Sequence, residues 1–168
     1  MNASKEPRQN TIACSAENNR QLTGPYTIPM ISVQNDQSTS RPSPRIFVFE
    51  PDDEVRPLLK QNLQTWGYDV TLAIDEADAL QRVEGGHDRF DLILLNQYNQ
   101  SIEHSIAIGQ QIRQHTVLDS RAPIVILAER YGPDLEGQDI QVGDNEYVSY
   151  LEDGQQLKLI LQRLCPVD

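Results

Sequence analysis

Basic residues are scarce in this sequence, and long apolar runs are absent. Only 14 Lys and Arg stand against 25 Asp and Glu, which gives the 168-residue chain a formal net charge of -11. An acidic surface repels nucleic-acid phosphates and anionic lipid, and no stretch reaches the ~18 consecutive apolar residues of a membrane span. We therefore expect neither nucleic acid nor a membrane among the direct partners, and we place the protein in the cytoplasm.

Cysteine and histidine are also scarce. Cys14 and Cys165 lie near opposite ends of the chain without a CxxC spacing, which favours two reduced thiols over a disulfide or a metal site. The three histidines, His87, His104 and His115, are too far apart in sequence for a paired-ligand motif, and we predict that they are surface residues. The sequence therefore predicts no metal ion and no cofactor.

The first 44 residues lack the large apolar side chains of a packed domain. They contain five of the ten prolines, many Asn, Gln, Ser and Thr, and a net charge of +1, which leaves -12 for residues 45–168. Such a composition does not offset the entropy cost of ordering the chain. We therefore predict a disordered tail or linker at residues 1–44 and a folded domain at residues 45–168.

One apolar segment interrupts this tail at residues 26–33. An extended apolar segment can add to a sheet edge or fill a groove on another protein. The same segment can also rest loosely on its own domain or be disordered, and we favour these two interpretations over docking. The candidate contact residues are Tyr26, Ile28, Met30 and Ile31.

From Arg45 onward, short apolar runs alternate with helical patterns, which is typical of repeated βα units around a parallel sheet. Continuous apolar character predicts strands that are buried on both faces, and apolar residues at i, i+3, i+4 and i+7 predict helices. The pattern predicts a (βα)5 doubly wound, flavodoxin-like parallel sheet of five strands. We expect the strands at residues 46–49, 68–72, 91–96, 123–128 and 146–150, and the last helix at 157–164.

The fourth helix of this pattern is the weakest. The segment between the last two predicted strands contains Gly132, Pro133 and Gly137. Inside a helix a Gly costs about 1 kcal/mol and a Pro about 3 kcal/mol relative to Ala. We therefore expect helix four to be short, displaced, disordered or missing.

Four segments at the predicted strand ends resemble the receiver domains of two-component response regulators, which have the CheY-like fold. They are EPDDEVR at residues 50–56, FDLILLN at 90–96, APIVILA at 122–128 and GDNEYV at 143–148, and the resemblance covers residues 45–165. In an open α/β sheet, ligands bind at the carboxyl ends of the strands. The resemblance therefore places the functional residues of the family at these ends.

The resemblance implies phosphoryl transfer to an aspartate, but this sequence departs from what that reaction needs. Asn96 stands where the family has the nucleophilic Asp, and a neutral amide cannot form the acyl phosphate. The family holds Mg2+ with two acids after its first strand, whereas the matching residues here are Glu50 and Pro51. The nucleophile and one of the two metal ligands are therefore missing.

Two further groups of the family site are also replaced. Ala128 stands where the family has a Ser or Thr that hydrogen-bonds the phosphoryl group, and Tyr150 stands where it has a Lys. Leu151 follows where the family usually has Pro. Tyr147 matches an aromatic residue that changes rotamer in active receivers, and without a hydroxyl at residue 128 we favour Tyr147 as a fixed packing residue.

These losses predict a degenerate pseudo-receiver that is not an enzyme. We expect a phosphorylation-independent interaction module whose partner is a protein, such as a signalling kinase or an output protein. The degenerate pocket consists of Glu50, Pro51, Asp52, Asn96, Ala128 and Tyr150, and the predicted partner face adds Tyr147, Tyr150 and Leu151 to the tail residues above. Two alternatives stay open. Asp52 or Asp53 can replace a lost group in a residual phosphotransfer site, or residues 1–44 can dock a structural subunit into a larger complex.

Overall fold

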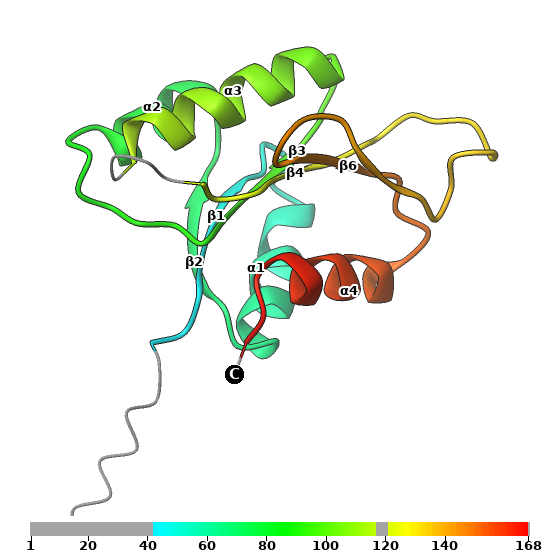
Figure 1. Cartoon of the computed structure of the whole chain (residues 1–168), viewed down its shortest axis with the longest axis horizontal. Helices are drawn as coiled ribbons and strands as arrows, with labels where there is room; N and C mark the ends of the chain where they lie inside the picture. The colour runs from blue at the N-terminus through cyan, green and yellow to red at the C-terminus, as the bar shows by residue number, and fades with distance from the viewer. Residues whose placement is uncertain (1–41, 117–120, 168) are drawn as a thin grey trace, which may run out of the picture. The chain divides into compact units, whose positions relative to one another are not determined.

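The computed structural model describes residues 42–116 and 121–167, which contain six strands and four helices (Figure 1). The predicted contact residues Tyr26, Ile28, Met30 and Ile31 lie outside this part of the chain. No helix within it is long and apolar enough to cross a membrane. In chain order the elements are β1 (Arg45–Phe49), α1 (Val55–Thr65), β2 (Asp69–Ala73), α2 (Glu76–Val83), β3 (Leu92–Asn96), α3 (Ile102–His115), β4 (Ile124–Leu127), β5 (Asp139–Gln141), β6 (Glu146–Ser149) and α4 (Gly154–Leu164).

The strands form one sheet in the order β2-β1-β3-β4-β6-β5. The first five strands of this order are parallel, and β5 pairs with β6 in the antiparallel direction. Helices α2 and α3 cover one face, and α1 and α4 cover the other (Figure 1). The doubly wound, flavodoxin-like architecture is confirmed, but the prediction of five strands was wrong by one, because β5 was not foreseen.

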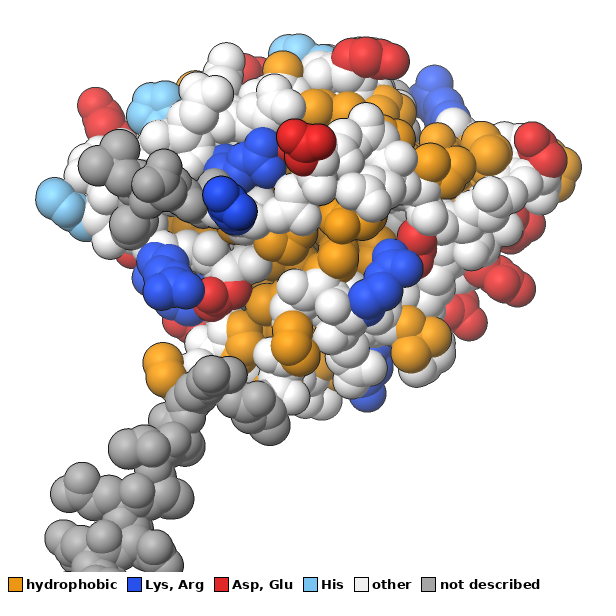
Figure 2. Space-filling view, viewed as in Figure 1, with side chains coloured by type: hydrophobic (Ala, Val, Ile, Leu, Met, Phe, Trp, Pro, Cys, Tyr) orange, Lys and Arg blue, Asp and Glu red, His pale blue; other side chains and the backbone are white. Residues whose placement is uncertain are grey.

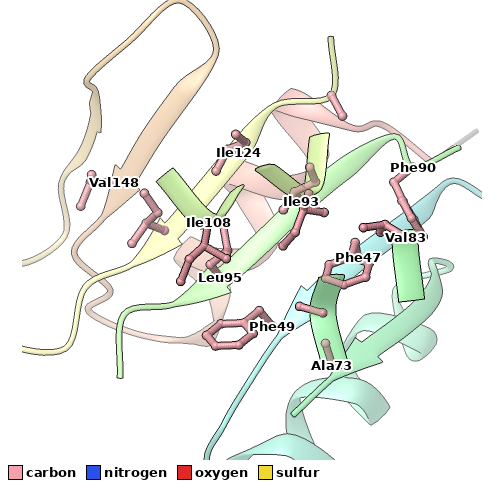
Figure 3. Packing of buried hydrophobic residues seen from close by; sticks show 14 residues of the cluster. Phe47, Phe49, Ala73, Val83, Phe90, Ile93, Leu95, Ile108, Ile124 and Val148 are labelled. Carbon is pink, nitrogen blue, oxygen red and sulfur yellow. The ribbon is translucent and has the colours of Figure 1, made fainter. Parts of the chain in front are cut away.

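Two apolar clusters hold the helices to the sheet. Side chains alternate between the faces of a strand, so Phe47, Ile93 and Leu95 face α2 and α3 (Figure 3), while Ile46 and Leu94 face α1 and α4. All five side chains are fully buried. Each contributes about 1.5–3 kcal/mol by leaving water. The continuous apolar runs in the sequence are explained by this burial on both faces.

The segment between β4 and β6 contains no helix, as its glycines and proline suggested. Residues 129–138 form bends and turns and lead into β5. Gly137 has φ +79°, its N–H donates to the Tyr150 carbonyl, and the Tyr150 N–H donates to the Gln138 carbonyl. Two residues thus oppose one, which is a β-bulge with glycine at the left-handed position. The chain between β4 and β6 therefore adds the antiparallel strand β5 to the edge of the sheet and forms no crossover helix.

Gly109 lets α3 approach the sheet closely, and replacing it tests that contact. A Cβ added at Gly109 would lie 2.8 Å from Ile124 Cγ2 and 3.0 Å from Leu95 Cδ1. Overpacking of this kind costs about 1–3 kcal/mol, while Ala gains about 1 kcal/mol in helix propensity. We expect Gly109→Ala to lose about 1 kcal/mol in urea unfolding. Gly154→Ala is the matched control, because its added Cβ meets nothing within 4 Å, and equal stability of the two variants would contradict the prediction.

Candidate functional site

The candidate site lies at the carboxyl ends of β1, β3, β4 and β6, which are neighbours in the sheet. Glu50, Ala128 and Tyr150 follow their strands directly, and Asn96 is the last residue of β3. Backbone hydrogen bonds continue the ladders past the strand ends, for example from the Ala128 N–H to the Ser149 carbonyl (3.0 Å). The positions that the sequence pattern singled out are therefore brought to one edge of the sheet.

Glu50 and Asn96 form the centre of this site. Glu50 is fully buried, and Asn96 Nδ2 donates to its Oε2 at 2.9 Å. The other carboxylate oxygen, Oε1, accepts from the Asp52 N–H at 3.0 Å. Burial raises the pKa of Glu50 above its ordinary value, and the Asn96 hydrogen bond opposes that rise. Asn96 therefore acts here as a donor that satisfies a buried carboxylate.

The loop after β1 is held by its own residues. Arg56 donates from Nε to the Glu50 carbonyl (2.8 Å) and from a terminal nitrogen to the Pro51 carbonyl (2.7 Å). Asp52 Oδ1 accepts from the backbone N–H groups of Glu54 (2.9 Å) and Val55 (3.4 Å). A carboxylate in this position satisfies donors that have no partner within the helix. Asp52 thus caps the amino end of α1 from outside the helix, while Asp53 makes no such contact.

The Mg2+ that the resemblance implies does not fit the oxygens present. Mg2+ demands near-octahedral coordination by well-placed oxygens. Pro51 offers no side-chain oxygen, and Asn96 turns its amide nitrogen toward Glu50 while its Oδ1 accepts from the Tyr98 N–H (3.3 Å). Within residues 42–116 and 121–167, no three His, Cys, Asp or Glu side chains are grouped to hold a metal ion. One buried carboxylate, already hydrogen-bonded, stands where two acids are needed.

Ala128 and Tyr150 close the other side of the site with apolar and aromatic surface. Both pack against the core cluster that faces α2 and α3. Tyr131, from the segment after β4, meets the Tyr150 ring edge to face, with centroids 5.3 Å apart, and its hydroxyl donates to the Leu151 carbonyl. Where the resemblance implies a hydroxyl and a lysine, this chain presents packed side chains without a charge for a phosphoryl group.

The predicted partner face is divided by the sheet. Tyr147 and Leu151 are partly buried against the cluster under α1 and α4, whereas Tyr150 packs on the opposite side. Tyr147 thus packs against the core, in agreement with its interpretation as a packing residue. The three side chains do not form one continuous surface, because Tyr147 and Tyr150 lie three residues apart and leave opposite faces of an extended chain.

Two loops beside the pocket hold each other. Tyr98 and Asn99 adopt positive φ angles of 32° and 58°, a region that residues other than glycine rarely occupy. The Asn99 N–H donates to Glu129 Oε2 (3.0 Å), and its Oδ1 accepts from Arg130 (2.9 Å). Gln97 Oε1 accepts from the Glu129 N–H (2.9 Å). The loops after β3 and β4 are therefore joined by polar side chains.

Sequence reasoning missed three residues of this arrangement. Tyr131 and Glu129 bond backbone groups of neighbouring loops, so their roles depend on how the loops meet, whereas Arg56 bonds two carbonyls of its own loop. Tyr131 carried a weak signal, since it is a large aromatic residue in a segment otherwise rich in glycine and polar residues. Arg56 is the last residue of the EPDDEVR segment that carries the resemblance, and its position in the sequence gives no sign that it bonds the loop carbonyls.

No family model matches the chain. In sequence it is 27% identical over 106 residues to the transcriptional regulatory protein PrrA of Mycobacterium leprae, covering 63% of this chain and 43% of PrrA. It is 30% identical over 105 residues to the uncharacterized transcriptional regulatory protein YrkP of Bacillus subtilis, covering 62% of this chain and 42% of YrkP. The chain thus matches less than half the length of these curated relatives.

The fold is also found among solved structures. The chain is similar to the receiver domain of the sensor histidine kinase PA1611 from Pseudomonas aeruginosa PAO1, with a TM-score of 0.52 and 23% identity, over 73% of this chain and 97% of that one. That crystal structure has a magnesium ion coordinated in its active-site cleft. The domain therefore has the CheY-like receiver fold, and the chain is related to the receiver domains of two-component response regulators.

Proposed function

We propose that this chain is a pseudo-receiver, a regulatory module that acts by binding another protein and not by accepting a phosphoryl group. The observation that carries the proposal is the Asn96 to Glu50 hydrogen bond. At the position of the family's nucleophile the chain has a neutral amide, and this amide satisfies the buried acid that would otherwise help to hold a metal ion.

The rest of the pocket supports the same proposal. Asp52 is engaged at the start of α1, so it is poorly placed to replace a lost ligand. Ala128 has no hydroxyl, and Tyr150 is packed against Tyr131. Phosphoryl transfer depends on positioning and on electrostatic stabilisation of the transferred group. A pocket that lacks the nucleophile, the second acid, the hydroxyl and the lysine supplies neither.

The partner in this proposal is a protein of two-component signalling, either a signalling kinase or an output protein, and the module works in the cytoplasm. Support comes from the relation to response-regulator receiver domains and from the names of the two relatives, which describe transcriptional regulators. Receiver folds connect a signal to a partner through their surfaces, and that role does not require the phosphoryl chemistry. The scaffold and its core are retained here while the site is rebuilt.

Phosphodonor labelling tests the proposal. We expect the wild-type chain, incubated with acetyl phosphate and MgCl2, to gain no phosphoryl mass in intact-mass spectrometry, because residue 96 cannot form the acyl phosphate. An active receiver domain serves as the positive control. Asn96→Asp is also expected to resist rapid labelling, since Ala128 and Tyr150 still lack the hydroxyl and the cation. Rapid, Mg2+-dependent labelling of either protein would contradict the proposal.

A further inference from the structure

We propose that the outer edge of β5 binds an extended, basic segment of a partner protein as an additional strand. The inference rests on the proposed function, because it specifies how the partner is recognised. The residues that would contact the partner, 139–142, lie outside the degenerate pocket, so the two proposals can fail separately.

The outer side of β5 carries backbone N–H and C=O groups that pair with no other strand of the described residues. β5 is the last strand of the sheet, and no strand of the described chain pairs with its outer side. The Gln138 carbonyl and the Val142 N–H bond to the segment of β6, and Ile140 lies between them, opposite Val148. In an antiparallel strand the backbone groups of successive residues point to opposite sides. Asp139 and Gln141 therefore direct their N–H and C=O groups away from β6, toward the open edge.

The edge is held in place by the side chain of Asp139. Its Oδ1 accepts from Ser149 Oγ (2.7 Å) and from Gln156 Nε2 (3.0 Å), and its Oδ2 lies 3.6 Å from Arg163. The bulge at Gly137 fixes the start of the strand. A binding edge that is already ordered costs less conformational entropy when a partner adds to it. The charge of Asp139 is also directed at its own domain, so it does not block the edge.

The side chains around the edge define the partner. Ile140 and Val142 lie on one face of the extended segment, and Val142 is 46% exposed, so alternate apolar side chains of an added strand would pack against them. Residues 131–157 contain seven acids and neither Lys nor Arg. Figure 2 shows acidic side chains gathered on the right of the view, where Figure 1 places the segment between β4 and β6. The exposed acids are Asp134, Glu136, Asp144, Glu152 and Asp153.

The acidic charge around the β5 edge favours a basic partner segment. Opposite charges across an interface speed association and suppress wrong partners, so an extended segment with Lys or Arg at alternate positions fits this edge. A second copy of the chain would bring the same acids against one another. The mode of binding is addition of a strand to a sheet edge, in which the backbone supplies affinity and alternate side chains supply specificity.

A display library of random twelve-residue peptides, selected on the full chain at low salt, tests the inference. We expect enriched peptides to alternate β-branched or aromatic residues with Lys or Arg, and to bind at least tenfold more weakly at high salt. Gln141→Pro removes the outward N–H without removing a bond to β6, a place where an edge strand tolerates proline. It is expected to weaken binding at least tenfold. Gln141→Ala is the matched control, because it keeps the N–H and loses only the side-chain bonds to Gly143 and Asp144.

Five outcomes would overturn the inference, and the first four concern the selected peptides and the oligomeric state. The first is a selection that enriches no peptide, and the second is one that enriches acidic or proline-rich peptides. The third is equal binding of the selected peptides to Gln141→Pro and wild type. Concentration-dependent dimerisation that Gln141→Pro abolishes would assign the edge to a second copy. A synthetic peptide of residues 24–35 that outcompetes the selected peptides would assign the edge to the chain's own N-terminal segment.

Each binding measurement is repeated with acetyl phosphate and MgCl2. Peptides that bind wild type and Gln141→Pro equally overturn the edge alone, whereas phosphoryl labelling of the wild type overturns the proposed function alone.

Discussion

Asn96→Asp is expected to lower the free energy of unfolding by about 3 kcal/mol at pH 7.5 in EDTA. The change removes the donor to Glu50 and sets a second carboxylate beside a fully buried one. Leaving a buried charged acceptor without its donor costs about 1–3 kcal/mol, and like charges that share a site add to this cost. Urea unfolding followed by circular dichroism measures the loss, with EDTA present so that no divalent cation neutralises the pair.

The pH dependence of this variant separates charge repulsion from a simple loss of contact. Like-charge proximity raises the pKa of the pair in the folded state above the unfolded value, so the folded state holds a proton that the unfolded state has already released. Stability then falls as the pH rises through that interval. The deficit of Asn96→Asp should therefore shrink at pH 5. Asn96→Ala is the control, because it removes the donor without adding charge, and an Asp variant as stable as the Ala variant at pH 7.5 would contradict the argument.

The fold could be predicted because burial on both faces leaves a plain mark in the sequence. The runs at β1, β3 and β4 are continuously apolar, and the residues that flank them match the receiver pattern. β5 could not be found in this way, because its three residues, Asp139, Ile140 and Gln141, form no apolar run and no alternation long enough to indicate a strand. β5 forms by pairing with the edge of β6. This pairing is possible because the preceding residues, 129–138, form no helix.

The sequence indicated which residues lie at the candidate site but not which contacts they make. Asn96 and Glu50 follow neighbouring strands, so their proximity follows from the topology of a parallel sheet. That Asn96 would donate to Glu50 does not follow from spacing, since an amide offers both a donor and an acceptor. For a related reason, the sequence did not show that the predicted partner residues Tyr147 and Tyr150 pack on opposite sides of the sheet. Tyr147 and Tyr150 were grouped by closeness in sequence, although three residues along a strand reverse the face.

Tyr150 belongs both to the candidate pocket and to the backbone pairing that begins β5. Tyr150 stands where the family has its lysine, and its backbone pairs with the bulge at Gly137 and Gln138 that begins the β5 edge. Tyr131 packs on the Tyr150 ring and donates to the Leu151 carbonyl. The segment between β4 and β6 is thus fixed to Tyr150, the residue that the resemblance matches to the family's lysine. These contacts support the proposed function, in which the module does not respond to phosphorylation.

The ion pair between Arg113 and Glu146 links α3 to the start of β6, and breaking it should have the largest effect on stability. Arg113 lies 2.5 Å from Glu146 Oε1, and the two side chains are 21% and 6% exposed. Burial raises the pKa of Glu146, but the Asn145 N–H, the Arg113 guanidinium and the Gln110 amide together hold it below its ordinary value. Glu146 thus contributes stability above the unfolded pKa, and this contribution is lost as the pH falls through the folded pKa.

Arg113→Met is expected to lower the free energy of unfolding by about 3–5 kcal/mol at pH 7, because it removes the cation from a buried carboxylate and leaves only the Asn145 N–H and the Gln110 amide, among the described residues, as donors to it. Arg82→Met is the matched control. Arg82 pairs with Asp78 at 2.9 Å but is 44% exposed, and pairs of that kind contribute about 0–1 kcal/mol. Adding Glu146→Gln to Arg113→Met should recover part of the loss, because the unpaired charge is gone. A loss at Arg113 no larger than at Arg82, or one that does not shrink below pH 4.5, would show that packing and not charge joins α3 to β6.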